Sequence, residues 1–243
     1  MTVVERRARE REARRRSILD AARDAFLEQG IAATTMDDIA RRAELSKGAL
    51  YLYFRSKDEM CFALLLEASE ALVRAMQGAV VPDRHPLEQL RQLAITYYRF
   101  YLSQPDYFRF MFVVEHQPYR GRVSEELLNQ WSVMGRQGLA VLADILQRGQ
   151  EQGLIRPLDP WQTAVAFWSA VTGTIVIPSQ EVRWVFLGRL DLEQLVLTTI
   201  QHFWEGIASP GHRSSERQML HGSGSEDPRL HPDPTFKEAR HDH

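Results

Sequence analysis

The segment from Thr35 to Phe54 constrains this 243-residue chain more than any other, because its pattern indicates two short helices joined by a tight turn. Thr35 is followed three residues later by Asp38, which fits a capping box, so a helix should begin near Met36. Ser46 is placed to cap the second helix in the same way. A short helix that follows such a turn and presents lysine, glycine and tyrosine suits binding to a polyanion.

Gly48 lies beside the start of the second expected helix. A glycine there costs about 1 kcal/mol of helix propensity, and its missing side chain permits close approach of the backbone to a target. Lys47 can reach a phosphate or a guanine edge, and the hydroxyls of Tyr51 and Tyr53 can donate to phosphate oxygens. For each residue alone, the alternative is a small helical hairpin with ordinary caps and a solvated lysine.

A helical pattern from Ile18 to Gly30 precedes this segment, and the run from Tyr51 to Glu59 closes it. Together, residues 15–62 resemble, without a gap, the DNA-binding domain of the TetR family of bacterial transcriptional regulators. The resemblance implies a three-helix, helix-turn-helix domain whose third helix enters the major groove. Many members carry histidine where this chain has Tyr53. The implied phosphate contacts are Thr35, Tyr51, Tyr53 and Lys57, and the residues implied nearest the bases are Ser46, Lys47 and Gly48.

Basic charge is concentrated near the N-terminus, although the formal net charge is −2. Between Arg6 and Arg16 there are seven arginines against two glutamates. We expect residues 1–14 to form a basic mobile arm attracted to DNA, either entering an adjacent minor groove or remaining a solvated tail. The alternative function is that of a helical protein that uses this arm to bind a partner or a membrane surface.

The remainder of the chain predicts helices throughout, so the fold class should be all-α. Ser56 is placed to cap a long helix that continues to about Gln77 and links the first domain to the second. We expect a larger helical effector-binding and dimerisation domain over residues 63–208. From residue 209 the composition changes to glycine, proline, serine, histidine and charged residues, which predicts a disordered tail over residues 209–243.

Aromatic and methionine residues are dense between Tyr97 and Met134. With a sensing domain implied by the resemblance, this density predicts a pocket for a hydrophobic or planar small molecule. Packing of a helical core is the alternative for each residue taken singly. The candidate pocket residues are Tyr97, Tyr101, Phe108, Met111, Phe112, His116, Trp131, Met134, Phe167 and Trp168.

Two final helices are expected at Pro160–Ile177 and Leu190–Ile207. Both carry small or apolar residues outside their main apolar stripe, so each needs a second packing partner. The resemblance implies a four-helix bundle formed by two copies of this pair. A homodimer would hold two recognition helices about 34–36 Å apart, which matches a near-palindromic DNA operator.

Several other functions lack support in the sequence. Cys61 is the single cysteine, which excludes an intramolecular disulfide framework and a multi-cysteine zinc site. No phosphate loop, nucleophile elbow or helical metal-binding pair is present, so we expect no enzyme activity, cofactor or metal. No apolar run reaches the roughly 18 residues of a membrane span, so we expect a cytoplasmic protein. The predicted function is a ligand-responsive DNA-binding regulator, most often a repressor in the resembling family.

Overall fold

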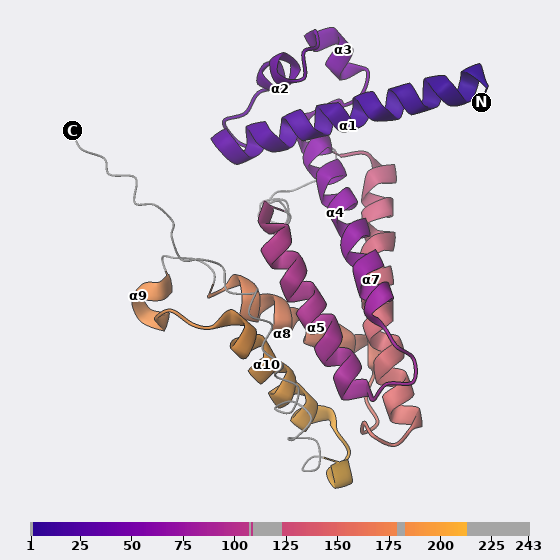
Figure 1. Ribbon diagram of the computed structural model, residues 1–243, viewed down its shortest axis with the longest axis vertical. Coiled ribbons are helices and arrows are strands. Elements are labelled where there is room, and N and C mark those ends of the chain that lie inside the picture. The colour runs from indigo at the N-terminus through magenta and orange to yellow at the C-terminus, as the bar shows by residue number, and fades with distance from the viewer. Residues whose placement is uncertain (1, 107, 109–122, 179–182, 213–243) are drawn as a thin grey trace, which may run out of the picture.

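The computed structural model describes residues 2–106, 108, 123–178 and 183–212. The regular elements of these residues are helices, which confirms the predicted all-α class. Helices α1 to α3 form a head at one end of the molecule, α4 leads out of this head, and the later helices form an elongated body (Figure 1). None of the helices described is long and apolar enough to cross a membrane.

Helix α1 (Val3–Gln29) lies across the end of α4. The Thr2 hydroxyl accepts a hydrogen bond from the Glu5 amide at 3.2 Å, and the Glu5 carboxylate accepts one from the Thr2 amide at 2.7 Å. The expected mobile arm at residues 1–14 is therefore wrong for residues 3–14. Arginine and glutamate are good helix formers, and these residues extend a helix that the head already anchors, so no new nucleus is needed.

Helix α2 (Met36–Arg42) packs on α1, and α3 (Lys47–Tyr51) packs on α2, which completes the head. The turn between them passes through Glu44, whose φ of 56° is unusual for a residue with a side chain. The Leu45 amide donates to the Ala40 carbonyl at 2.9 Å and closes this turn. The buried residues at the centre of the head are Ile18, Leu19, Ala22, Phe26, Ile39, Ala40, Leu50 and Phe54.

Helix α4 (Lys57–Ala79) belongs to both parts of the molecule. Its first turns bury Met60 and Leu64 against the head, and its later turns pack against α5 (Pro86–Ser103) and α7 (Glu125–Glu151). The division expected between residues 62 and 63 falls inside this uninterrupted helix. A change in its tilt would therefore move the head relative to the body.

Helices α8 (Pro160–Val176), α9 (Trp184–Leu187) and α10 (Leu192–Ile207) complete the body. In Figure 1 they lie on the side away from the N-terminus of α1. The Ser209 amide donates to the Leu154 carbonyl at 2.9 Å, and a 3-10 turn follows at Pro210–His212. The expected disordered tail is thus wrong for its first four residues, because this bond ties them to the body; residues 213–243 lie outside the described residues.

Candidate nucleic-acid interface and effector cavity

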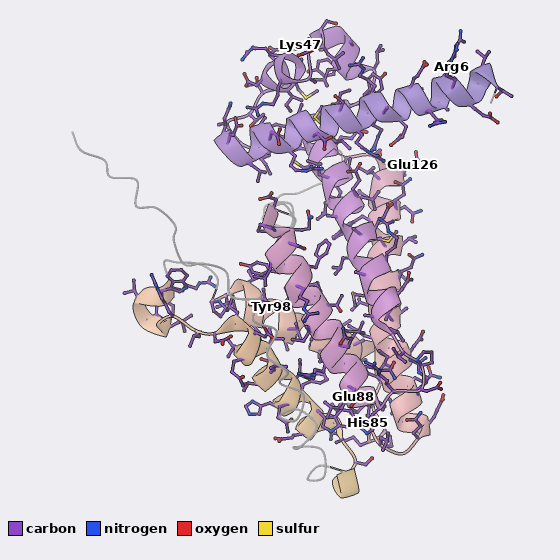
Figure 2. The ribbon with its side chains drawn as sticks, viewed as in Figure 1. Arg6, Lys47, His85, Glu88, Tyr98 and Glu126 are labelled. Atoms are coloured by element: carbon purple, nitrogen blue, oxygen red, sulfur yellow. The ribbon has the colours of Figure 1, made fainter. Side chains whose placement is uncertain are left out.

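The outer surface of α3 carries three of the predicted DNA-contacting residues. Ser46 caps the helix by accepting a hydrogen bond from the Ala49 amide at 3.2 Å, as its position in the sequence predicts. Lys47, Gly48 and Tyr51 are exposed, whereas Leu50 is buried in the head. Figure 2 shows Lys47 at the outer end of the head, on the side away from the body. The helix therefore offers a basic and hydroxyl-bearing surface to a partner.

Helix α2 orients Lys47. The Lys47 ammonium lies 3.0 Å from the Asp37 carboxylate, and both side chains are more than half exposed. The hydrogen bond from Lys47 to this carboxylate, with the attraction between the charges, raises the pKa of Lys47. Lys47 is thus held as a cation at the surface of the head. There its ammonium could bind a DNA phosphate or a base edge, either in place of the Asp37 carboxylate or together with it.

Gly48 is not required by the packing of the protein. A Cβ atom built at this position would meet no atom within 4 Å, and Gly48 lacks the positive φ that favours glycine. The fold would accept alanine here. The absent side chain is therefore available for close contact with something outside the chain, as the sequence predicts.

Three of the four predicted phosphate contacts lie in different environments. The Thr35 hydroxyl is exposed but already donates to the Asp38 carboxylate at 2.6 Å, within the predicted capping box. Tyr51 is 45% exposed. Tyr53 is half-buried, with the guanidinium carbon of Arg11 located 5.9 Å from its ring centre. Of the two tyrosines, Tyr51 is therefore the more accessible to a phosphate.

Lys57 has a structural role that the sequence-based assignment missed. Its ammonium donates to the carbonyls of Ile31, Ala32 and Thr34 at 2.6, 3.0 and 3.0 Å. These carbonyls belong to the loop between α1 and α2, and the ammonium has only three protons to donate. Lys57 therefore fastens the start of α4 to this loop. Its contact with phosphate stays a prediction, and these bonds would have to be given up to make it.

A cavity of about 200 Å³ lies in the body, and α4, α5, α7 and α8 line it. The Ser69 hydroxyl in its wall donates to the Leu65 carbonyl at 2.7 Å, and the Tyr97 hydroxyl is 3.0 Å from that of Thr172. None of its described lining residues carries a charge. They are Ser69, Leu72, Val73, Met76, Tyr97, Trp131, Met134, Gly135, Gly138, Leu139, Leu142 and Trp168.

Four of the ten predicted pocket residues line this cavity, namely Tyr97, Trp131, Met134 and Trp168. Phe167 lies outside it and meets Phe203 edge to face, with ring centres 5.0 Å apart.

Two further candidates, Tyr101 and Phe108, also lie outside the cavity and pack against each other, with ring centres 5.1 Å apart. Their aromatic side chains serve the core, which is the alternative that the sequence left open. Met111, Phe112 and His116 lie outside the described residues.

The walls that α4 and part of α7 supply were not predicted from the sequence. Gly135 and Gly138 are three residues apart in α7 and face the cavity, so their spacing was a usable sign of an opening beside this helix. Leu72 and Met76 of α4 lie in the helix that the sequence predicts only as a link between domains. No local pattern could show that this helix reaches the pocket, because its neighbours there come from distant parts of the chain.

A second hollow, of about 340 Å³, lies where the head joins the body. Arg23 of α1, Glu67 of α4 and Phe100 of α5 line it together with further apolar and polar residues. Because polar and apolar residues are mixed in this lining, the hollow is less suited to an apolar molecule than the first cavity is. No group of three or more metal-binding side chains is found among the residues that the structure describes.

Comparison with known proteins agrees with this arrangement of head and body. Residues 18–64 match the model of the bacterial regulatory proteins of the tetR family, and residues 90–195 match the tetracyclin repressor-like C-terminal domain. The transcriptional regulator TtgR of Pseudomonas putida is 30% identical over 180 residues, which cover 71% of this chain and 83% of TtgR.

Two further relatives extend the comparison. The A-factor receptor protein of Streptomyces griseus is 27% identical over 202 residues, which cover 81% of this chain and 64% of that protein. The fold also matches that of SmeT, the repressor of a multidrug efflux pump of Stenotrophomonas maltophilia, with a TM-score of 0.60 at 22% identity over 82% of this chain and 92% of SmeT. A complex of SmeT with triclosan has the same fold.

The family consists of transcription regulators that bind DNA operators and often respond to small ligands, and it is not a family of enzymes. This chain contains the two parts that such a regulator needs, a helix-turn-helix head and a helical body with a cavity. The chain belongs to the TetR family of DNA-binding transcriptional regulators.

Proposed function

We propose that the protein is a homodimeric repressor in the cytoplasm that binds a near-palindromic operator and releases it when a small, uncharged, hydrophobic effector enters the cavity. The observation that carries this proposal is the path of α4. Ser69, Leu72, Val73 and Met76 of this one helix form a wall of the cavity, and its first residue, Lys57, holds the head.

The geometry of α4 supplies the coupling between the two sites. Lys57 precedes Leu72 by fifteen residues, which is about 22 Å along a helix at 1.5 Å per residue. A ligand that spreads the cavity wall would tilt α4 as a rigid rod, and Lys57 would carry the loop between α1 and α2 with it. A coupling free energy of about 1–3 kcal/mol would change the affinity for DNA roughly 5–150-fold.

The cavity lining defines the effector chemistry. Trp131, Trp168 and Met134 favour an apolar or planar molecule, and the absence of a charged group from the described lining disfavours a carboxylate or an amine. The hydroxyls of Ser69 and Tyr97 already have partners within the protein. The SmeT complex with triclosan is a precedent for a hydrophobic aromatic ligand in a protein of this fold.

The exposed face of α8 supports pairing of two protomers through the predicted helices Pro160–Ile177 and Leu190–Ile207. Ala166 and Ser169 are exposed on this face, and Ala170 and Gly173 beside them are half-buried. Small residues at this spacing let a second helix approach closely. The Thr174 and Thr199 hydroxyls lie 3.0 Å apart and fix α8 against α10, so both helices would enter the interface as one unit.

The first experiment is binding of the purified protein to DNA from around its own gene, against random competitor DNA. Protection of a near-palindromic site that disappears when a neutral aromatic compound such as triclosan is added would support the proposal. Sequence-blind binding that persists after selection from random DNA would contradict it. The Ser169→Arg variant should sediment as a monomer and lose operator binding, whereas Gln147→Arg, on the exposed surface of α7, should stay dimeric.

The cavity is tested with substitutions of Gly135. Gly135→Phe should fill the cavity, so that the effector no longer releases the operator although operator binding stays intact. Gly135→Ala should keep both operator binding and release by the effector. Gly135 lies within a helix, and a Cβ atom there would meet no atom within 4 Å, so alanine at this position should stabilise the helix. An equal response of both variants to the effector would place the ligand elsewhere.

A further inference from the structure

The first turns of α1 form an arginine-bearing helix that extends past the head. Residues 2–14 are all exposed, and in Figure 1 the N-terminus of α1 projects beyond α3. The Arg6 guanidinium lies 3.7 Å from the Glu10 carboxylate, a weak exposed pair, and the segment keeps an excess of positive charge. A solvent-exposed helix with this excess of positive charge is suited to binding a polyanion.

The arginines of this segment are arranged on a defined face. Residues 7, 11 and 14 share one side of the helix with the buried Ile18, because they precede it by eleven, seven and four residues. The face that packs on the head therefore continues outward as an arginine stripe, defined here as Arg7, Arg11 and Arg14.

The arginine stripe is attached to the end of α3. The Arg11 guanidinium carbon lies 5.9 Å from the ring centre of Tyr53, and that of Arg15 lies 5.2 Å from the ring centre of Phe54. Tyr53 and Phe54 lie two and three residues after the last residue of α3, so these contacts place the stripe beside the proposed DNA-reading surface. A duplex lying on α3 would pass close to Arg7 and Arg14.

We propose that the arginine stripe binds the phosphates of the DNA that flanks each operator half-site. The proposal rests on the function proposed above. Because α8 and α10 lie on the opposite side of the molecule, a dimer formed through them would point both stripes outward, away from the operator centre (Figure 1). From Val3 to Arg14 the helix is about 16 Å long, which corresponds to roughly five base pairs of flanking DNA.

A matched pair of double variants tests this proposal. Arg7→Gln/Arg14→Gln removes two charges from the stripe, whereas Arg9→Gln/Arg16→Gln removes two charges from the opposite face, two residues further along the helix. Circular dichroism checks that both remain helical. Binding is measured by fluorescence anisotropy on the selected operator without flanks, on the operator with flanks longer than the helix, and on random duplex of the same length.

The stripe variant should bind the flanked operator and random duplex about tenfold more weakly than the wild type. The slope of log affinity against log salt concentration should fall by about 0.9 for each phosphate that the variant no longer neutralises. The stripe variant should bind the unflanked operator as the wild type does, and the control variant should match the wild type on all three. Equal weakening in both variants, or none in either, would overturn the proposal. Binding to phosphatidylserine vesicles is measured in parallel. A stripe variant that binds DNA as the wild type does but binds these vesicles more weakly would also overturn the proposal.

Failure of the regulator proposal has a different signature. It would appear as a wild-type protein with no preference for any sequence. In that case weaker binding of the stripe variant alone to random duplex would still support phosphate binding by the stripe.

Discussion

The ring of Phe62 in α4 meets the ring of Trp131 in α7 edge to face, with ring centres 6.1 Å apart. Phe62 is 1% exposed and lies five residues after Lys57, near the head, whereas Trp131 lines the cavity. A molecule that displaces the Trp131 indole would therefore press on α4 at a point close to the head. This pair is a second physical link between the cavity and the proposed DNA surface.

Trp131→Ala should uncouple the two sites. It removes the edge-to-face interaction, worth about 0.5–1.5 kcal/mol beyond the change in buried area, and leaves Phe62 without this neighbour. We expect operator binding to persist and release by a cavity ligand to weaken severalfold. Titration of the DNA complex with the ligand measures this. Trp131→Phe keeps an aromatic ring and should retain most of the response; a failure of release in this variant as well would argue against a role for the ring pair.

Lys57→Met should destabilise the head. The methionine keeps most of the aliphatic stem but removes three charge-assisted hydrogen bonds to the loop between α1 and α2, which should lower the free energy of unfolding by about 2–3 kcal/mol. Urea denaturation measures this decrease. Lys47→Met is the control, because solvent screens its exposed pair with Asp37 and the pair contributes little to stability.

The opposite result would favour the assignment made from sequence. If Lys57→Met unfolds at the same urea concentration as the wild type but its DNA affinity depends less on salt, then Lys57 binds phosphate in the complex.

Gly48→Ala should change stability and DNA binding in opposite directions. A Cβ atom at this position meets nothing in the protein, and alanine improves helix propensity by up to about 1 kcal/mol, so the melting temperature should stay the same or rise. Specific DNA affinity should fall, because the added methyl group would hold the backbone away from the groove. Gly78→Ala, in the last turns of α4, is a control that should leave DNA binding unchanged. Undiminished affinity in Gly48→Ala would remove the argument for close approach.

The sequence predicts best what depends on neighbouring residues. Thr35, Ser46 and Ser56 each cap the helix that follows, as their hydroxyls and spacing indicate. The segment around Val171 and Ile175 is locally prone to form a strand but lies within α8, because both side chains are buried in a helical stripe. These features follow from helical period and local hydrogen bonding.

Features that depend on distant residues are not predictable in this way. Lys57 bonds to Ile31, which is 26 residues earlier in the chain, and no periodic pattern reveals that bond. Residues 3–14 differ from prediction for another reason, since their charge density suggests mobility although they continue an anchored helix. The aromatic pattern between Tyr97 and Met134 identifies the right region but does not separate pocket from core.

Glu67→Gln should make the protein relatively more stable as the pH rises from about 4 to 7. Desolvation raises the pKa of Glu67 above its ordinary value of 4.5, and the attraction of Arg15, Arg23 and Arg16 offsets this only in part. A carboxyl group whose pKa is raised on folding stabilises the folded state below its unfolded pKa, and this contribution is lost as the pH rises through the folded pKa. Glutamine avoids that loss because it stays neutral.

Urea denaturation of both proteins across this pH range measures the difference. The side chain of Glu67 is 39% exposed and its carboxylate lies 3.7 Å from Arg15, so solvent screens the effect. Glu70→Gln, one turn further along α4, is the matched control, because it removes a carboxylate that pairs with the exposed Arg74 on the same helix. A Glu67→Gln variant that loses stability relative to the wild type as the pH rises would show that the ion pair with Arg15 outweighs desolvation where α1 crosses α4.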